Sequence, residues 1–227
     1  MVDDKLKKYI EDNIFPIYEN NDWGHSLEHI NYVIDRSIRF ASTLSNINYD
    51  MVYTVAAYHD IGHYIDAMNH EKISSEILLN DEALKDFFNS EQISIMSEAV
   101  YDHRSNMKGE PRSIYGKIVS SADRNTIIDV SLKRTYEYRL FHCPDDSIEY
   151  VIENSRQHIL DKFGKNGYAK EKMYFEDNDY KVFLQNISNL AENIDLFKKK
   201  YCEINNIKLT EVKRLSKNGG FIWRRTI

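Results

Sequence analysis

Glycine and proline are scarce in this chain, and their scarcity constrains the fold more than any other feature of the sequence. The 227 residues include only 8 glycines and 3 prolines, the residue types that most often interrupt regular secondary structure. We therefore expect long helices to dominate. Several segments also space their apolar residues three and four positions apart, as one face of a helix requires. The sequence predicts an all-α fold, a helical bundle of one domain.

The predicted helices cover most of the chain. Residues 25–42 place their apolar side chains in one stripe at helical spacing. Residues 51–62 are apolar almost all round, which predicts a central buried helix with Asp50 as its N-terminal cap and Gly62 at its end. Further helices are predicted after this one, at residues 70–78, 91–103, 147–163 and 179–201.

Composition separates a helical domain from a C-terminal extension. Residues 207–227 form a basic stretch, which we interpret as a tail or a small extension. We expect one domain over residues 1–206. Its motif-bearing core covers about residues 20–140, and its further helices lie in residues 145–206.

Charge and cysteine content narrow the class of protein. The formal net charge is −6, which argues against general nucleic-acid binding because that function calls for a basic face. The two cysteines, Cys143 and Cys202, are far apart, as is typical of a protein in a reducing cytosol. The N-terminal sequence lacks an apolar signal core, and no apolar run approaches the length of a membrane span. We therefore expect a soluble, cytoplasmic protein that does not bind membranes.

An adjacent histidine and aspartate end the most apolar of the predicted helices. They are His59 and Asp60, in the stretch AAYHDIGHY at residues 56–64. Because burying a charged group without a partner is costly, the pair either serves packing and local hydrogen bonding or holds something that needs both an imidazole and a carboxylate. His29 lies four residues before Val33, at the edge of the apolar stripe of the preceding helix, so its ring can also face the interior.

A second carboxylate is expected at an interior position further along the chain. Pro111 can open a long helix through Ile127. On that helix Asp123 has Val119 and Ile127 four residues away on either side, which points its carboxylate toward apolar surroundings. A nearby cation is the usual remedy for a buried carboxylate. Because mixed imidazole and carboxylate ligands suit divalent transition metals, these residues indicate a metal site.

The order of these residues resembles the HD-domain superfamily of metal-dependent phosphohydrolases. EHINYVI is similar to the helix of the family's first histidine, AAYHDIGH to its name-giving dipeptide, and KIVSSADR to its closing aspartate helix. The resemblance covers about residues 20–140 at the level of motifs, and the later helices more loosely. It implies a helical bundle of the HD-domain type. It also implies that one metal ion is held by His29, His59, Asp60 and Asp123.

The same resemblance raises the question of a second metal ion. Some HD subfamilies have two further histidines between the dipeptide and the last aspartate, and the dipeptide aspartate then bridges both ions. His70 and His103 stand at such positions, and the stretch from His103 to Asp123 is similar to the corresponding part of HD-type dinucleoside tetraphosphatases. The alternatives are a solvent-facing His70 at a helix start and a phosphate-binding His103 in a loop. One or two divalent ions are therefore expected, drawn from Mn, Fe, Ni, Co, Zn and Mg.

The activity that this resemblance implies is hydrolysis of a phosphoester or phosphoanhydride by metal-activated water. The expected substrate is a nucleotide or a related small phosphorylated metabolite. The residues expected to act in catalysis are Asp60, His63 and Arg124, and those expected to bind substrate are Arg104, Lys108, Arg112 and His25. The alternative for Arg124 is a salt bridge within the fold, and the alternative for His25 is exposure at a helix start.

Two other functions are compatible with the same residues. Some HD-type proteins hold two irons and oxidise their substrate with dioxygen, and a six-ligand set would permit that chemistry. A non-catalytic nucleotide-sensing module, in which ions only hold a ligand, is the alternative from another class. The sequence leaves the substrate, the native metal and the formation of a homo-oligomer open.

Overall fold

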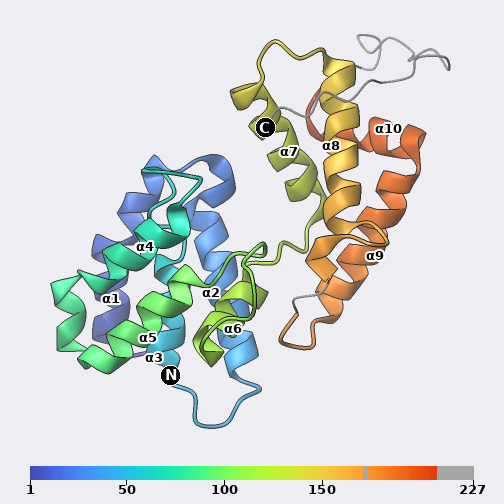
Figure 1. The fold of residues 1–227 in the computed structure, drawn as a ribbon. Coiled ribbons are helices and arrows are strands. Elements are labelled where there is room, and N and C mark those ends of the chain that lie inside the picture. Colours follow the sequence, from blue (N-terminus) through green and yellow to red (C-terminus); the bar gives the residue numbers. More distant parts are fainter. Residues whose placement is uncertain (171–172, 209–227) are drawn as a thin grey trace. The chain divides into compact units, whose positions relative to one another are not determined.

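The structure of the protein is a computed structural model that describes residues 1–170 and 173–208. All regular secondary structure in these residues is helical. They contain ten α-helices and four short 3-10 helices, and no strand (Figure 1). The predicted all-α fold is confirmed. Within the same residues, no helix is both long enough and apolar enough to span a membrane.

The described residues group into two compact units. Unit 1 consists of Met1–Thr126 and Tyr168–Lys181, and unit 2 consists of Ile127–Gly167 together with residues 182–208. A single domain over residues 1–206 stays a prediction. The predicted tail at 207–227 lies, apart from its first two residues, outside the described residues.

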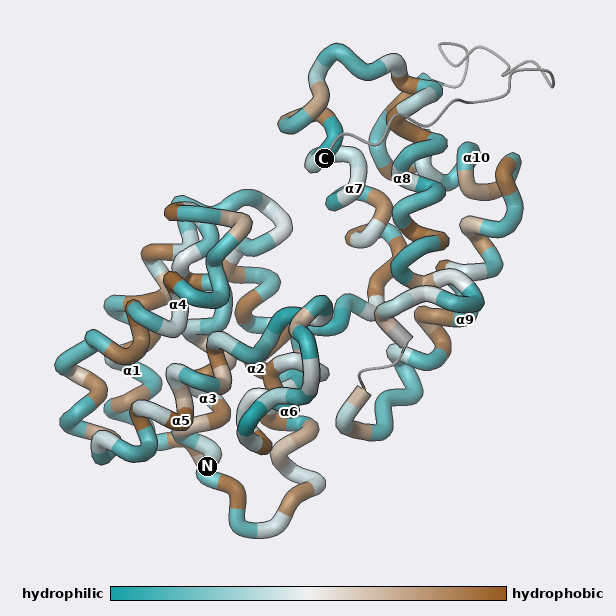
Figure 2. The backbone as a smooth tube through the Cα atoms, in the orientation of Figure 1, coloured by the Kyte–Doolittle hydropathy of each residue, from teal (hydrophilic) through white to brown (hydrophobic). Residues whose placement is uncertain are grey.

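Unit 1 packs its helices around a central one. Its helices are α1 (Asp4–Asn13), α2 (Leu27–Ala41), α3 (Tyr49–Tyr58), α4 (His70–Leu79), α5 (Ser90–Tyr101) and α6 (Ile114–Ala122). Helix α3 contacts α1, α2, α4, α5 and α6, and residues 51–62 are all buried. The prediction of a central buried helix is therefore confirmed. In Figure 2, hydrophobic and hydrophilic residues alternate at short intervals along the helices, as amphipathic packing requires.

The ends of α3 differ from those predicted. Asn48, rather than Asp50, caps the helix, because its side chain accepts hydrogen bonds from the backbone N–H groups of Asp50 and Met51. The Asp50 carboxylate instead accepts a hydrogen bond from the Asp3 backbone N–H at 2.8 Å. The helix ends at Tyr58, so His59 and Asp60 lie in the turn that follows and not in the helix.

Helix α6 is shorter than predicted at both ends. Ser113 caps it by accepting a hydrogen bond from the Gly116 backbone N–H at 3.2 Å, which leaves Pro111 outside the helix. The helix ends at Ala122, and Ile127 is half exposed. Thr126, between the two, shares a hydrogen bond of 2.9 Å with the Tyr32 hydroxyl of α2.

Unit 2 is built from α7 (Ile128–His142), α8 (Ile148–Phe163), most of α9 (Asn178–Glu192) and α10 (Ile194–Ile204). Helix α8 matches its prediction closely. The single helix predicted over 179–201 is wrong, because Asn193 separates α9 from α10. Its backbone is extended, and its side chain accepts a hydrogen bond from the Leu196 backbone N–H at 3.0 Å, which starts a new helix. Helices α1 and α7 were not predicted.

Candidate metal centre

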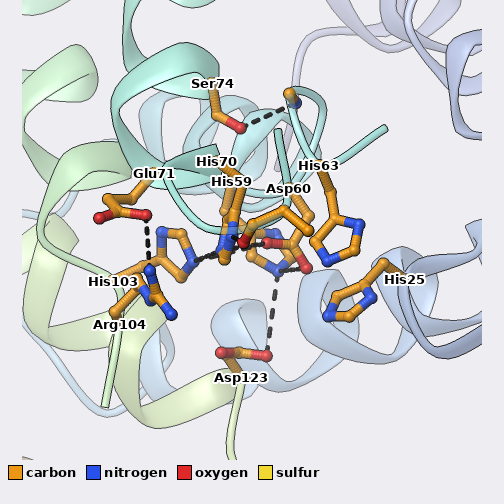
Figure 3. Close-up of polar contacts among 12 residues, drawn as sticks. His25, His59, Asp60, His63, His70, Glu71, Ser74, His103, Arg104 and Asp123 are labelled. Carbon is orange, nitrogen blue, oxygen red and sulfur yellow. Dashed lines mark hydrogen bonds and ion pairs between the residues drawn. The ribbon is translucent and has the colours of Figure 1, made fainter. Parts of the chain in front are cut away.

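Histidine and aspartate side chains from five places in unit 1, each in a helix or directly after one, converge near the end of α3. They lie in α2, after α3, at the first residue of α4, after α5 and after α6 (Figure 3). The side chains that meet there are His29, His59, Asp60, His70, His103 and Asp123. The structure thus brings together all six residues that the sequence proposes as metal ligands. Their role as ligands stays a proposal.

Asp60 lies at the centre of this cluster, and its two oxygens face different histidines. Oδ2 lies 3.5 Å from His29 Nε2 and 3.2 Å from His59 Nε2. Oδ1 lies 3.2 Å from His70 Nε2 and 3.5 Å from His103 Nε2. The carboxylate is buried. Each oxygen of the carboxylate therefore faces its own pair of imidazole nitrogens.

The candidate ligand atoms of the cluster form two groups of three. In the first group, Asp123 Oδ1 lies 3.1 Å from His29 Nε2 and 3.9 Å from His59 Nε2. In the second, Asp60 is joined by His70 and His103. Within each group all ligand atoms lie within 4.8 Å of one another, close enough for one ion to reach all three.

Three of the four imidazoles have their orientation set by the backbone. In His59, His70 and His103, Nδ1 lies 2.6 to 2.9 Å from the carbonyl oxygen of the residue three positions earlier. Because a carbonyl can only accept, Nδ1 is the protonated nitrogen that donates. In the neutral ring Nε2 then carries a lone pair, and this is the atom that faces Asp60. Such a hydrogen bond at the far nitrogen is typical of metal-binding histidines.

The cluster fits a divalent cation. Among the described residues, His29 Nε2 and His59 Nε2 are buried without a hydrogen-bond partner. Burial opposes ionisation of Asp60 and Asp123, yet the neighbouring imidazoles lower the pKa of both carboxyls. Burial also lowers the pKa of His59, but the Asp60 carboxylate outweighs it and raises the pKa to about 9. The site thus favours positive charge at its centre, and a divalent ion supplies it through ligands of the preferred type.

Comparison with known families agrees with this geometry. A family model described as the HD domain matches residues 24–126, a range that includes all six residues of the cluster. Residues 24–126 form an HD domain. Comparisons with curated proteins and with solved structures find no match.

A further group of three polar residues borders the candidate metal centre. The rings of His25 and His63 stack with their centroids 3.6 Å apart and an interplanar angle of 20°. His25 Nδ1 lies 2.7 Å from Asp22 Oδ1, and His63 Nδ1 lies 3.9 Å from Asp22 Oδ2. The His63 ring is 5.2 Å from the ring of His70. His63 and His25, proposed from sequence as catalytic and substrate-binding residues, thus stand beside the cluster.

The stacking makes this group a poorer fit for a cation than the other two. Each ring nitrogen directs its lone pair within the plane of its ring, so two stacked and nearly parallel rings keep their lone pairs in separate, nearly parallel planes. Burial, followed by the charge of His25, lowers the pKa of His63 to about 4. Burial raises the pKa of Asp22, but the hydrogen bond from His25 outweighs it and brings the pKa to about 2. The group is better described as an imidazole pair anchored by a carboxylate.

The proposed cationic residues occupy different environments. Arg104, next to His103, donates from Nη1 to Glu71 Oε2 at 3.0 Å (Figure 3). The same Nη1 donates to the Met68 carbonyl at 2.8 Å. Its guanidinium therefore lies beside the second group. Lys108 is exposed and Arg124 is buried. Their contacts with substrate stay predictions.

Arg112 forms an ion pair that fixes the loop after α5. Its Nε and Nη2 donate to the two oxygens of Asp102 at 2.9 and 2.8 Å, and Asp102 is buried. Asp102 directly precedes His103, so this pair supports the backbone that presents a candidate ligand. The guanidinium of Arg112 is engaged by Asp102. A contact of Arg112 with substrate stays a prediction.

Sequence reasoning missed two residues that support the centre. Asn21 donates from Nδ2 to the carbonyls of Asp60 and His25, at 3.1 and 3.0 Å. Asp22 anchors the imidazole pair. The only sequence signal is the spacing of Asp22 three residues before His25, which suits a side chain capping a short helical turn, as observed.

Proposed function

We propose that the protein is a metal-dependent phosphohydrolase that cleaves a phosphoester or phosphoanhydride of a nucleotide or a related small phosphorylated metabolite. The observation that carries this proposal is the position of Asp60. Each oxygen of its carboxylate faces a separate pair of histidine Nε2 atoms, at 3.2 to 3.5 Å. A cluster of this kind is suited to two divalent ions that share one carboxylate.

The chemistry that such ions supply is Lewis acidity, which activates water as a nucleophile and offsets negative charge on phosphoryl oxygens. The protein contributes preorganised ligands. The hydrogen bonds from Nδ1 of His59, His70 and His103 to backbone carbonyls hold each Nε2 in place. Burial of Asp60 limits access of bulk water, which strengthens electrostatic interactions inside the site.

Groups at the border of the centre are placed to act on the substrate. His63 and His25 carry ring nitrogens next to the His70 ring, where they can hydrogen-bond a phosphoryl oxygen or a leaving group. Arg104 is the nearest arginine in sequence to a candidate ligand of the second group, and a guanidinium matches the geometry of phosphate oxygens. His63 would thus have a catalytic role, and His25 and Arg104 would bind substrate.

The size and charge of the substrate follow from the charge of the chain. The formal net charge of −6 disfavours a long polyanion, whose binding needs an extended basic surface. A small phosphorylated molecule needs only the local positive charge of the ions and of a few side chains. We therefore propose a small substrate and no general binding of nucleic acid.

The test is elemental analysis of the purified full-length chain, followed by a screen for phosphate or pyrophosphate release from nucleotides with Mn²⁺, Fe²⁺, Ni²⁺, Co²⁺, Zn²⁺ and Mg²⁺. Asp60→Asn should reduce turnover by more than about 100-fold, the upper end of the loss on removing even an outer-shell partner of a metal ligand. Asp35→Asn, an exposed carboxylate on α2, is the matched control and should retain activity.

Three outcomes separate this function from its alternatives. Phosphate release in the absence of dioxygen supports hydrolysis. A strict requirement for dioxygen identifies oxidation chemistry instead and contradicts the proposal. Tight nucleotide binding by the metal-loaded protein without any product after long incubation identifies a sensing module and contradicts it as well.

A further inference from the structure

A buried ion pair joins α2 to a segment far outside the HD domain. Arg36 Nη2 lies 2.5 Å from Asp177 Oδ2, and both side chains are buried. The two residues are separated by 141 positions in sequence. Asp177 directly precedes α9 and belongs to the second stretch of unit 1, which follows residues 127–167 of unit 2. Burial of a charged pair demands that each partner be compensated, so the two positions depend on each other.

The same guanidinium holds the end of α6. Arg36 Nε donates to the Ala122 carbonyl at 2.9 Å, and Nη2 lies 3.4 Å from the Ser121 carbonyl. The last carbonyls of a helix have no partner within the helix and carry its negative partial charge, so an arginine there is favourable. The next residue along the chain is Asp123, whose carboxylate lies 3.1 Å from His29 Nε2 in the first group of the metal centre.

Other contacts of the same segment reach the same two helices. The Tyr174 backbone N–H donates to Ser121 Oγ at 3.4 Å, at the end of α6. The Phe175 ring stacks on that of Phe40 in α2, with centroids 5.1 Å apart and an interplanar angle of 17°. Residues 174–177 therefore contact both the helix that carries His29 and the helix end that carries Asp123.

We propose that Asp177 is a positioning residue for the metal centre, acting through Arg36 to hold Asp123 against His29. The inference rests on the proposed role of Asp123 as a metal ligand. Residues 173–181 then support the proposed metal centre although they lie outside the HD domain at residues 24–126. We expect the positioning to act on the group of His29, His59 and Asp123, which contains the positioned carboxylate, rather than on the group of Asp60, His70 and His103.

The test compares Asp177→Asn with the matched control Asp179→Asn in the full-length chain. An asparagine at 177 removes the charge opposite Arg36 and opposite the exposed Arg39, whose Nη2 lies 3.5 Å from Asp177 Oδ1. It can still accept the hydrogen bond that Tyr180 N–H donates to Asp177 Oδ1 at 3.2 Å. Asp179 is exposed and pairs with the exposed Arg39 at 3.0 Å, two residues further along the same segment. Both variants thus lose one carboxylate charge near the start of α9, and only one loses the buried pair.

The readout is the affinity of each metal ion, from chelator competition with Mn²⁺ and Co²⁺, together with metal per chain and thermal unfolding of the metal-free protein. Asp177→Asn should lower the affinity for one of two ions about tenfold, the lower end of the loss in metal affinity when a hydrogen-bond partner of a metal ligand is removed. The second ion should bind as in the wild type, kcat should fall more than KM changes, and Asp179→Asn should behave as the wild type.

Two further variants keep the test informative if Asp177→Asn folds poorly. Arg36→Lys retains the charge but cannot donate to the carboxylate and to the α6 carbonyls from one planar fork, so it should weaken the same ion selectively. Asp177→Glu retains the charge and should restore part of the lost affinity. Equal weakening of both ions, in step with loss of folding stability, would identify a purely structural pair and overturn the inference.

The failure of the inference differs from the failure of the metal centre itself. If the wild type binds two ions and Asp177→Asn and Arg36→Lys bind both with unchanged affinity, the positioning role is wrong and the centre stands. If the wild type binds no divalent ion, the proposed centre is wrong, and the inference falls with it.

Discussion

The rings of His70 and His103 face each other with their Nε2 atoms 3.2 Å apart. Both rings use Nδ1 to donate to a backbone carbonyl, so the two facing nitrogens are both acceptors unless a proton or a cation lies between them. The same two nitrogens flank Asp60 Oδ1. This pair is therefore the part of the cluster that decides between one ion and two.

Replacing His103 tests the second ion directly. We expect His103→Ala to lower the metal content from about two ions per chain to about one, because the second group loses one of three ligands. Elemental analysis after desalting measures the content. His142→Ala, in unit 2 and exposed, is the control and should leave the content unchanged. An unchanged content in His103→Ala would show that His103 does not hold a second ion.

Replacing Asp123 tests the first ion. We expect Asp123→Ala to abolish metal-dependent turnover and to weaken retention of an ion, because the carboxylate lies 3.1 Å from His29 Nε2 in a group of only three ligand atoms. The measurements are phosphate release and metal content after dialysis against a chelator. Asp129→Ala, an exposed carboxylate six residues later, is the control. Wild-type turnover in Asp123→Ala would remove this residue from the site.

Acid stability should depend on Asp22. Its pKa is lowered to about 2 in the folded protein, against about 3.9 for an unperturbed aspartate. A lowered pKa stabilises the fold above the unfolded value, so this contribution is present above about pH 4 and is lost as the pH falls toward 2. The side chain is more than half exposed, so the effect should stay below about 1 kcal/mol.

Thermal unfolding between pH 2 and pH 6 measures that contribution. Asp22→Asn should be slightly less stable than the wild type at pH 6 and should approach it at pH 2. Asp12→Asn, an exposed residue paired with Lys8 on α1, is the control. A constant difference between Asp22→Asn and the wild type over this pH range would contradict the assignment.

Glycine is required at position 62 by the close approach of α4. A Cβ there would lie 2.7 Å from Ile73 Cγ2 and 2.8 Å from the Ser74 backbone nitrogen. We expect Gly62→Ala to destabilise the protein by about 1–3 kcal/mol, the usual cost of overpacking, and to weaken metal binding by shifting Asp60 relative to His70. Denaturant unfolding and metal content measure the two effects.

The control for this substitution is Gly109→Ala. Gly109 has a φ of 86°, and a Cβ there would meet nothing within 4 Å, so only backbone strain is added. Its metal content should match that of the wild type. If Gly62→Ala retained full stability and metal content, α4 would have to tolerate a displacement that the packing argues against.

The parts of the fold that could be predicted from sequence are those encoded by local pattern. The stripe in α2 and the apolar α3 are visible in the order of residues alone, and so are the interior positions of His29 and the His59–Asp60 pair. The break at Asn193 was missed because apolar spacing continues through it, while the side chain that starts the new helix acts on a single backbone N–H.

The support of the metal centre could not be predicted, because it depends on tertiary contacts. Asn21 binds the backbone carbonyl of Asp60 from 39 positions away, and Asp177 reaches Arg36 across 141 positions. The residues near Asp177 in sequence give no signal that its partner is Arg36. A carboxylate ahead of a helix is read locally as a cap, which Asp177 also is.

The return of the chain to unit 1 has a consequence for synthesis on the ribosome. The chain leaves unit 1 after Thr126 and returns to it only at Tyr168, so Asp177 emerges well after every histidine of the cluster. Translation adds about 5–20 residues per second, so several seconds pass between Asp123 and Asp177. During that interval the nascent chain carries all six proposed metal ligands, while the contact between Arg36 and Asp177 has not yet been made.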